Sequence, residues 1–145
     1  MTNNIINLMV GNEESFAKLY RKYAAIFGGI DLWSTLEKEE KIHAQWLKAL
    51  AQSHDTHLLQ VGPVSIALIK KLGEDVEEEI KSKNNTTLNQ ALKKALSFER
   101  SFIEKNFFEL FSDNIPSARK VMQKLKKETL DHISHIEVKI GSVDG

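Results

Sequence analysis

The chain has 145 residues, with 20 basic and 20 acidic side chains, so its formal net charge is zero. This length is typical of a single domain with a core of its own, and balanced charge gives no electrostatic attraction to nucleic acid or an acidic membrane surface. The absence of cysteine excludes disulfides, thiolate catalysis and cysteine-ligated clusters.

Few residues in the chain interrupt helices, since it has only two prolines and seven glycines. The N-terminal stretch MTNNIINLMVGNEES has no basic start followed by a long apolar run, and no apolar stretch approaches membrane-spanning length. We therefore expect a soluble, cytoplasmic, all-α protein in which residues 1–145 form a single domain, with no membrane or nucleic-acid partner.

The first predicted helix runs from about Asn3 to Phe27. Its apolar face recurs at steps of three and four and consists of Ile6, Val10, Glu13, Ala17, Tyr20, Ala24 and Phe27. Glu13 is the charged interruption, and Glu14 lies beside it, nearer the flank. The Gly28–Gly29 pair ends the helix, and Asp31 is placed to cap the next one. So short a connection predicts an antiparallel helix pair.

The second predicted helix, from about Leu32 to Gln52, carries two polar residues on its inward face. That face consists of Leu32, Leu36, Glu40, His43, Leu47 and Leu50. A buried carboxylate and imidazole cost free energy unless something pairs with them. Four-helix bundles use such a Glu-x-x-His pair to hold metal, whereas the alternative is a buried hydrogen-bonded pair. His54 and His57, in the irregular segment that follows, are interpreted as solvated surface residues.

A third predicted helix, from Pro63 to about Lys83, has one narrow apolar edge and many charges, which is typical of a surface helix. The edge consists of Leu68, Leu72, Val76 and Ile80. The next helix starts at Thr86 or Thr87 and runs to about Phe111. Its inward face consists of Leu88, Leu92, Ala95, Glu99, Phe102, Asn106 and Leu110, so Glu99 is its charged interruption.

The last predicted helix runs from about Ser117 to Lys139, and residues 141–145 are expected to be a frayed tail. Its inward face consists of Ala118, Met122, Leu125, Thr129, His132, Ile136 and Ile140. His132 interrupts this stripe, and Glu128 lies on its edge, four residues earlier. Glu13 and Glu99 are each either a metal ligand or a hydrogen-bond partner of a neighbouring tyrosine or histidine.

The two halves of the chain repeat one order, in which a helix with an inward Glu precedes a helix with an inward His. The stretches GNEESFAKLYRKYA and LEKEEKIHAQWL, followed by ALSFERSFIEKNFFELF and KLKKETLDHISHIE, resemble the rubrerythrin branch of the ferritin-like superfamily over nearly the whole chain. That family carries a lone Glu and then Glu-x-x-His, twice. The resemblance implies a ferritin-like four-helix bundle with an extra crossover helix between helices two and three of the bundle. The predicted helix from Pro63 to about Lys83 is this crossover helix.

The same resemblance implies a dinuclear metal site. It places ligands at Glu13 (or Glu14), Glu40, His43, Glu99 and His132. Such proteins hold two irons, or iron with another metal such as manganese or zinc, and react with peroxide or dioxygen. A homodimer is an expectation by analogy with the family only. Tyr20, seven residues beyond Glu13, is placed either to contact a metal-bound ligand or to pack in the core.

The second half departs from the family pattern, because Thr129 stands three residues before His132 where a glutamate is expected. Glu128 is one position away and is the candidate replacement ligand. The cysteine-rich extension of full-length rubrerythrins is absent, so catalysis would need a separate electron donor. The alternative function is a helical interaction or sensor module with a degenerate metal site and no catalysis.

Overall fold

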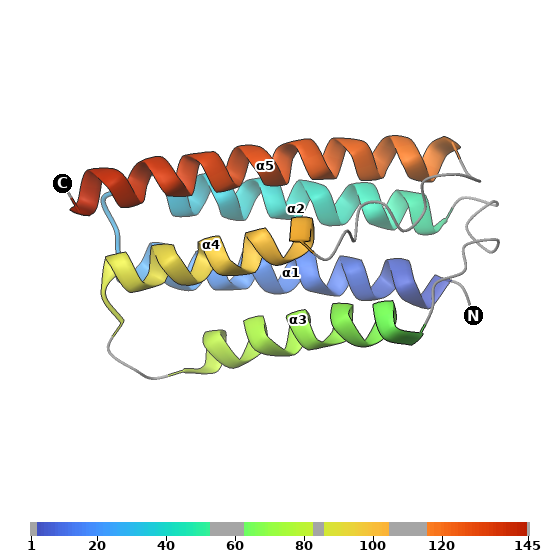
Figure 1. Ribbon diagram of the computed structural model, residues 1–145, viewed down its shortest axis with the longest axis horizontal. Coiled ribbons are helices and arrows are strands. Elements are labelled where there is room, and N and C mark those ends of the chain that lie inside the picture. Colours follow the sequence, from blue (N-terminus) through green and yellow to red (C-terminus); the bar gives the residue numbers. More distant parts are fainter. Residues whose placement is uncertain (1–2, 53–62, 83–85, 105–115, 145) are drawn as a thin grey trace.

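The computed structural model describes residues 3–52, 63–82, 86–104 and 116–144. Within these ranges all regular secondary structure is helical: α1 (Asn3–Ile26), α2 (Leu32–Ala51), α3 (Pro63–Lys81), α4 (Leu88–Glu104) and α5 (Pro116–Asp144). Successive helices alternate in direction along one long axis (Figure 1). None of the described helices has the length and apolar content needed to cross a membrane. The expected all-α bundle is confirmed for the described part of the chain.

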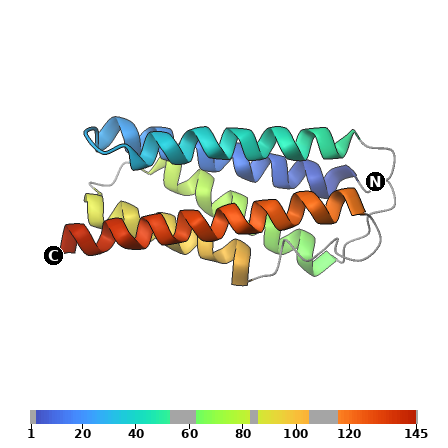
Figure 2. The same ribbon diagram turned by 90° about the horizontal axis from the view of Figure 1, so that it is seen from above.

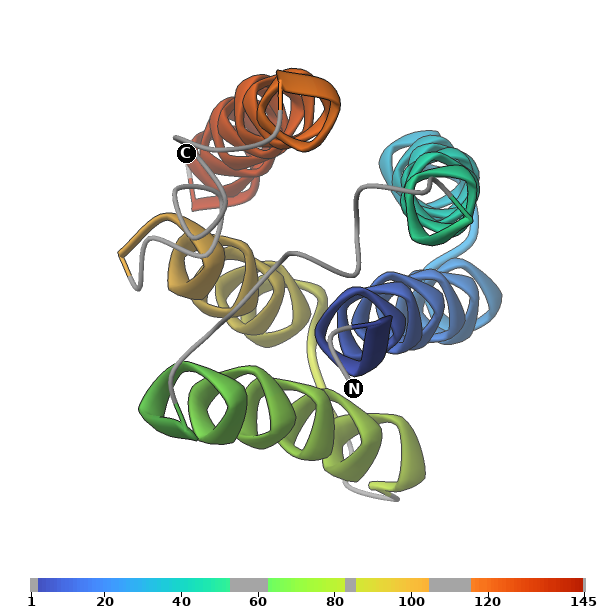
Figure 3. The same ribbon diagram turned by 90° about the vertical axis from the view of Figure 1, so that its right-hand side faces the viewer.

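Four helices surround a common centre, and the fifth packs against the outside of this group. The end-on view shows α1, α2, α4 and α5 around a common centre, with α3 lying along the outside (Figure 3). α1 packs on α2 and α3, while α5 packs on α4 and α2. Because the connection between α2 and α4 includes α3, these two helices run in the same direction (Figures 1 and 2).

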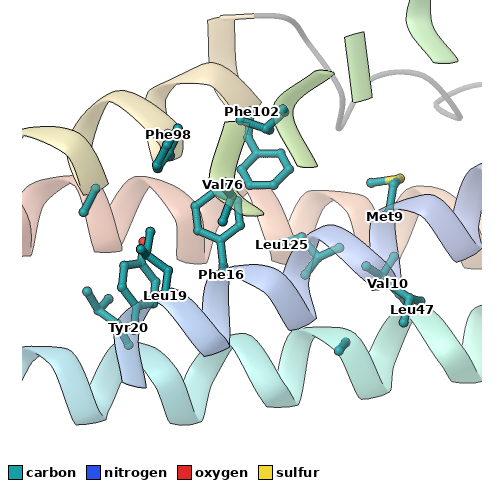
Figure 4. Packing of buried hydrophobic residues seen from close by; sticks show 14 of the residues in the cluster. Met9, Val10, Phe16, Leu19, Tyr20, Leu47, Val76, Phe98, Phe102 and Leu125 are labelled. Carbon is teal, nitrogen blue, oxygen red and sulfur yellow. The ribbon is translucent and has the colours of Figure 1, made fainter. Parts of the chain in front are cut away.

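The core is built from the apolar stripes that the sequence predicts. Phe16 of α1 points toward α4, and its ring centroid lies 5.1 Å from that of Phe102 and 6.1 Å from that of Phe98 (Figure 4). Aromatic pairs at such separations stabilise a core beyond the burial of their area. The packing holds α1 and α4 in position, and both carry a predicted ligand.

Local sequence accounts for the helix ends. Gly29 adopts φ of +101°, a conformation that favours glycine, in the turn between α1 and α2. Thr87 and Gln90 form a capping box at the start of α4. The backbone N–H of Gln90 donates to Thr87 Oγ1, and the backbone N–H of Thr87 donates to Oε1 of the Gln90 side chain. Asp31 holds the N-cap position of α2 as expected, but its side chain makes no capping hydrogen bond.

The end of α5 also differs from the prediction, because the helix continues through Gly141 to Asp144. Glycine lowers helix propensity by about 1 kcal/mol but does not break a helix, and Ile140 still packs against the core. Ser142 Oγ donates to the carbonyl of Lys139 in this last turn. The expected continuation of α4 to Phe111, with Asn106 and Leu110, lies outside the described residues, as do His54 and His57.

A row of polar contacts fastens α3 to α1. Asn12 Nδ2 donates to the carbonyl of Ile69 at 3.0 Å, and the hydroxyl of Ser15 donates to Glu77 at 2.9 Å. Lys22 Nζ donates to three carbonyls at the end of α3: those of Glu79 and Ile80 in its last turn and that of Ser82, which follows it. Apolar contact comes from the buried Ile69, Leu72 and Val76, while Leu68 and Ile80 are only partly buried. The narrow apolar edge is therefore supplemented by hydrogen bonds.

We expect the α1–α3 contact to be sensitive to one methyl group. A Cβ atom added at Gly73 would lie 2.3 Å from Asn12 Oδ1, so Gly73→Ala forces Asn12 away from Ile69. The expected loss in unfolding free energy is about 1–3 kcal/mol. Gly11→Ala on α1 meets nothing within 4 Å and should stabilise by about 0.5–1 kcal/mol. Urea denaturation of both variants checks this, and equal stability changes would contradict it.

Candidate metal centre

Five predicted ligands meet inside the bundle. They come from the four core helices and are at most 3 % exposed: Glu13 on α1, Glu40 and His43 on α2, Glu99 on α4 and His132 on α5. Each interrupts the apolar stripe of its helix, and burial of the stripe carries the polar side chain inward. Glu14 is exposed and pairs with Lys48 at 3.0 Å, so Glu13 is the inward residue of the two.

Glu40 lies at the centre of the cluster and contacts both imidazoles. Its Oε1 atom is 3.3 Å from Nδ1 of His43 and 3.1 Å from Nδ1 of His132. The two rings stack with centroids 5.5 Å apart. The donor atoms of Glu40 and the two histidines all lie within 4.8 Å of one another. A carboxylate on α2 is thus shared by histidines from two different helices.

Each histidine also approaches a carboxylate of its own. Nδ1 of His43 is 3.5 Å from Glu13 Oε2, and Nδ1 of His132 is 3.4 Å from Glu99 Oε1. The cluster therefore divides into two similar half-sites that share Glu40, one with Glu13 and His43 and the other with Glu99 and His132. Each half-site offers one nitrogen and two carboxylate groups.

The atoms that face the centre make no hydrogen bond of good geometry within the described part of the chain, although carboxylates lie 3.1–3.5 Å from both imidazole nitrogens. These atoms are Glu13 Oε2, His43 Nδ1 and His132 Nδ1, all buried. An unsatisfied buried polar atom costs about 1–3 kcal/mol. Imidazole nitrogen and carboxylate oxygen are donors that suit iron, manganese and zinc, and ligand bonds of about 2.0–2.2 Å place adjacent donors about 3.0–3.5 Å apart. The residues present therefore fit a metal ion.

The outer edge of each imidazole is held by a carboxylate from the opposite helix. Nε2 of His43 is 2.8 Å from Oε1 of Glu128 on α5, and Nε2 of His132 is 3.1 Å from Oε1 of Glu39 on α2. The side chains of Glu128 and Glu39 are 31 % and 32 % exposed. A carboxylate at the far ring nitrogen orients a metal-binding histidine and selects its tautomer.

Glu128 was expected among the ligands as a replacement for a missing glutamate, but the structure gives it this other contact. It lies against the outer edge of His43, away from the Nδ1 atom that faces Glu40. Sequence reasoning did not single out Glu39. A signal for it was present, because Glu39 precedes His43 by four residues, as Glu128 precedes His132.

Thr129 occupies the place in the second half that Glu40 occupies in the first, three residues before the histidine. It is buried, and its hydroxyl donates to the carbonyl of Leu125 at 2.9 Å. Thr129 therefore brings no carboxylate to the centre, and its hydroxyl hydrogen is engaged by its own helix. The cluster consequently has three central carboxylates, from Glu13, Glu40 and Glu99.

Tyr20 contacts the cluster from α1. Its hydroxyl donates to Oε1 of Glu99 at 2.6 Å in fully buried surroundings. The expected contact between Tyr20 and a candidate ligand is therefore present, and it orients the carboxylate of Glu99. Trp46 also contacts the cluster, with its ring centroid 5.3 Å from that of His43.

Burial and the charges of neighbouring side chains together set the pKa values of the cluster. Burial, reinforced by the charge of Glu40, raises the pKa of Glu13 well above its usual range and also raises the pKa of Glu99. Burial acts in the same direction on Glu40, but the imidazoles of His132 and His43 outweigh it and lower its pKa.

Neighbouring carboxylates raise the pKa values of the two histidines against the effect of burial. Burial disfavours their charged form, but the carboxylates of Glu13 and Glu40 raise the pKa of His43 to about 11. Likewise, Glu40 and Glu99 raise the pKa of His132 to about 12 against the effect of burial. Without metal, both imidazoles are therefore cationic at neutral pH and must lose protons before Nδ1 can bind a metal.

We expect opposite pH trends for metal-free stability and for metal affinity. The unfolded histidines titrate near pH 6.5 and the folded ones near 11 and 12. Their contribution to stability is fully present below about pH 6.5 and is lost as pH rises toward 11–12. Metal displaces these protons, so affinity should rise about tenfold per pH unit for each proton released. Denaturant titrations and calorimetry with Zn(II) between pH 6.5 and 8.5 check both slopes; a pH-independent affinity would contradict the assignment.

In comparisons with protein-family models, curated proteins and solved structures, none matches this chain.

Proposed function

We propose that this protein is a ferritin-like, rubrerythrin-like dinuclear metal protein that reduces peroxide or handles iron and oxygen. The observation that carries the proposal is the convergence of five buried ligand groups from four helices, with both Nδ1 atoms directed at Glu40 and lacking hydrogen bonds. Bundles of this kind bind two metals with a Glu from each of two helices and a Glu-x-x-His motif from the others.

The helix arrangement supports the ferritin-like part of the proposal. α2 and α4 run in the same direction because a long crossover joins them, whereas an up-down bundle joins all its helices by short loops (Figure 1). α3 is part of that crossover and packs on α1 along the outside of the four-helix group. The crossover places the Glu-bearing helices α1 and α4, and the His-bearing helices α2 and α5, around one centre.

The ligand assignment follows the two half-sites. Glu13 and His43 would hold one metal, Glu99 and His132 the other, and Glu40 would bridge them. Iron, or iron with manganese or zinc, would supply the electrons that reduce peroxide or dioxygen, and would leave coordination positions open to the oxidant. With threonine in place of a carboxylate at position 129, the protein would supply one ligand group fewer to a bound metal. Because the chain has no cysteine, we assign the supply of electrons to a separate donor.

Metal content provides the test of this proposal. Protein expressed in iron-supplemented medium should retain about two irons per chain, and the reduced form should consume hydrogen peroxide in a stopped-flow measurement. Protein that contains no iron, manganese or zinc after such growth, and that cannot be loaded in vitro, would contradict it.

A second function, an interaction or sensor module without catalysis, is favoured by Thr129. Thr129 stands where the first half of the chain has Glu40, and its hydroxyl donates to the carbonyl of Leu125. The second half therefore lacks the carboxylate that Glu40 supplies in the first. In that case the cationic imidazoles of His43 and His132 would be neutralised by the surrounding carboxylates as a structural ion cluster. The same metal analysis separates the two functions, since the module would be isolated without metal.

The outer carboxylates yield a prediction about metal affinity. Glu128→Gln and Glu39→Gln remove the charge that orients His43 and His132 but leave the ligands in place. Each change should weaken metal binding about 10–100-fold, the usual effect of losing such a partner. Glu14→Gln, which neutralises an exposed carboxylate paired with Lys48, serves as the control. Isothermal titration with Mn(II) measures all three, and unchanged affinity in both outer variants would contradict the orienting role.

A further inference from the structure

A row of aromatic residues leads from the metal centre toward α3. The ring of Tyr20 stacks on Trp33 with centroids 5.9 Å apart, and Trp33 lies 4.8 Å from Tyr23. All three side chains are at most 1 % exposed. Figure 4 shows the first member, Tyr20, with its hydroxyl inside the packed core. These are the side-chain types that give up single electrons, and their rings are in successive contact.

Each tyrosine in the row has a carboxylate to receive its proton. The hydroxyl of Tyr20 donates to Glu99 Oε1 at 2.6 Å, and the hydroxyl of Tyr23 donates to Glu79 Oε2 at 2.8 Å. Oxidation of a phenol to a phenoxyl radical releases a proton, so a hydrogen-bonded base favours it. Trp33 Nε1 has no hydrogen-bond partner among the described residues, so an oxidised Trp33 would keep its proton and pass the charge on.

We propose that Tyr20, Trp33 and Tyr23 form a relay that carries one-electron oxidising equivalents from the metal centre to the surface of α3. The relay rests on the proposed function, because hydrogen peroxide at the centre would be the oxidant. When the metals are already oxidised, breaking the O–O bond of one peroxide to give two waters takes two electrons and two protons, and each electron would come from one passage along the relay. Tyr20 gives one electron to the centre and its proton to Glu99. An electron from Trp33 then restores Tyr20, whose proton returns from Glu99. Tyr23 restores Trp33 and releases its own proton to Glu79.

The far end of the relay opens on a groove. Glu79 lines a cavity of about 640 Å³ between α3 and α4, together with Glu78, Asp75 and Lys94. The proton released by Tyr23 can leave through this groove, and a small water-soluble one-electron reductant can restore Tyr23 from it. Lys22, the neighbour of Tyr23 in sequence, binds the carbonyls at the end of α3 and holds Glu79 in position.

A competing path through Trp46 is less favourable. Trp46 contacts His43, but Nζ of Lys124 lies 4.0 Å above its ring. A lysine cation at this distance stabilises a neutral ring and opposes the positive charge of an oxidised one. Trp33 has no such cation among its described ring contacts, which are with Tyr20 and Tyr23.

The composition of the chain makes the relay directly testable, because its only tyrosines are Tyr20 and Tyr23 and its only tryptophans are Trp33 and Trp46. Iron-loaded protein is mixed with hydrogen peroxide, freeze-quenched and examined by electron paramagnetic resonance, with ring-deuterated tyrosine or tryptophan to assign the radical. We expect a tyrosyl radical. Trp33→Phe should confine it to Tyr20, whereas Trp46→Phe, the matched control, should leave it unchanged.

Two further variants separate proton transfer from packing. Tyr23→Phe should abolish reduction of the radical by ascorbate from solution. Glu79→Gln keeps the size of the side chain and the Tyr23 ring but removes the base, so the signal from Tyr23 should be lost while the melting temperature is retained. A radical on Trp46, or iron binding and peroxide consumption without any tyrosyl radical, would overturn the relay and leave the proposed function standing.

A metal-free arm keeps the relay testable if the chain binds no iron. A photogenerated ruthenium(III) polypyridyl oxidant in solution should produce a tyrosyl radical in the metal-free protein through the groove. Tyr23→Phe should remove most of this signal, because Tyr23 is the member of the relay beside the groove and Trp33 and Tyr20 are reached through it. An equal yield of tyrosyl radical in the unmodified chain and in Tyr23→Phe would overturn the relay, whatever the metal content.

Discussion

Glu40→Gln is expected to abolish metal binding while leaving the bundle folded. Oε1 of Glu40 approaches both Nδ1 atoms, at 3.3 and 3.1 Å, so one substitution removes the carboxylate shared by the two half-sites. The loss should exceed the roughly 100-fold that removal of an outer partner causes. Glutamine has nearly the volume of glutamate, so the change leaves no cavity. Glu13 and Glu99, whose pKa values burial raises, can ionise to neutralise the histidines.

The measurement is metal content after gel filtration, together with a calorimetric titration. Glu37→Gln is the control, because Glu37 lies on the same helix, one turn before Glu40, and pairs with Lys41 near the surface. It should bind metal as the unmodified chain does. If Glu40→Gln retains metal, Glu40 and His43 are a buried polar pair, and the proposed function loses its central ligand.

Metal is expected to raise the melting temperature of the folded chain. The half-sites form only when four helices come together, so metal binds the folded state and stabilises it by mass action. At free metal of about 100 times Kd the gain is about 2.7 kcal/mol. For a chain of this size each kcal/mol shifts the melting temperature by about 2–4 °C, which gives roughly 5–11 °C.

Differential scanning calorimetry with Fe(II) under anaerobic conditions, Mn(II) and Zn(II) measures this shift. Mg(II) is the control ion, since it prefers an all-oxygen octahedral shell and the centre supplies two nitrogens. Glu40→Gln should show no shift with any of the four ions. Unchanged melting of the unmodified chain with Fe(II), Mn(II) and Zn(II) would argue for the module without metal.

The sequence by itself determined the inward face of each helix and therefore most of the candidate ligands. The helical period is a local property, so Glu13, Glu40, His43, Glu99 and His132 could be placed inside the bundle by counting steps of three and four. Local chemistry also predicted the turn at Gly29 and the start of α4 after Thr87. None of these predictions depends on how the helices lie relative to one another.

Only the tertiary structure decided which atoms meet across helices. Glu128 and Glu39 pair with histidines 85 and 93 residues away, through the packing of α2 against α5. The same packing turns both Nδ1 atoms toward Glu40, so that Nε2 faces outward, and no one-dimensional pattern encodes the orientation of a ring. The stacking of Tyr20 on Trp33 and the contact of Tyr23 with α3 likewise require distant segments to be placed together, because side-chain contacts between helices depend on their separation and rotation.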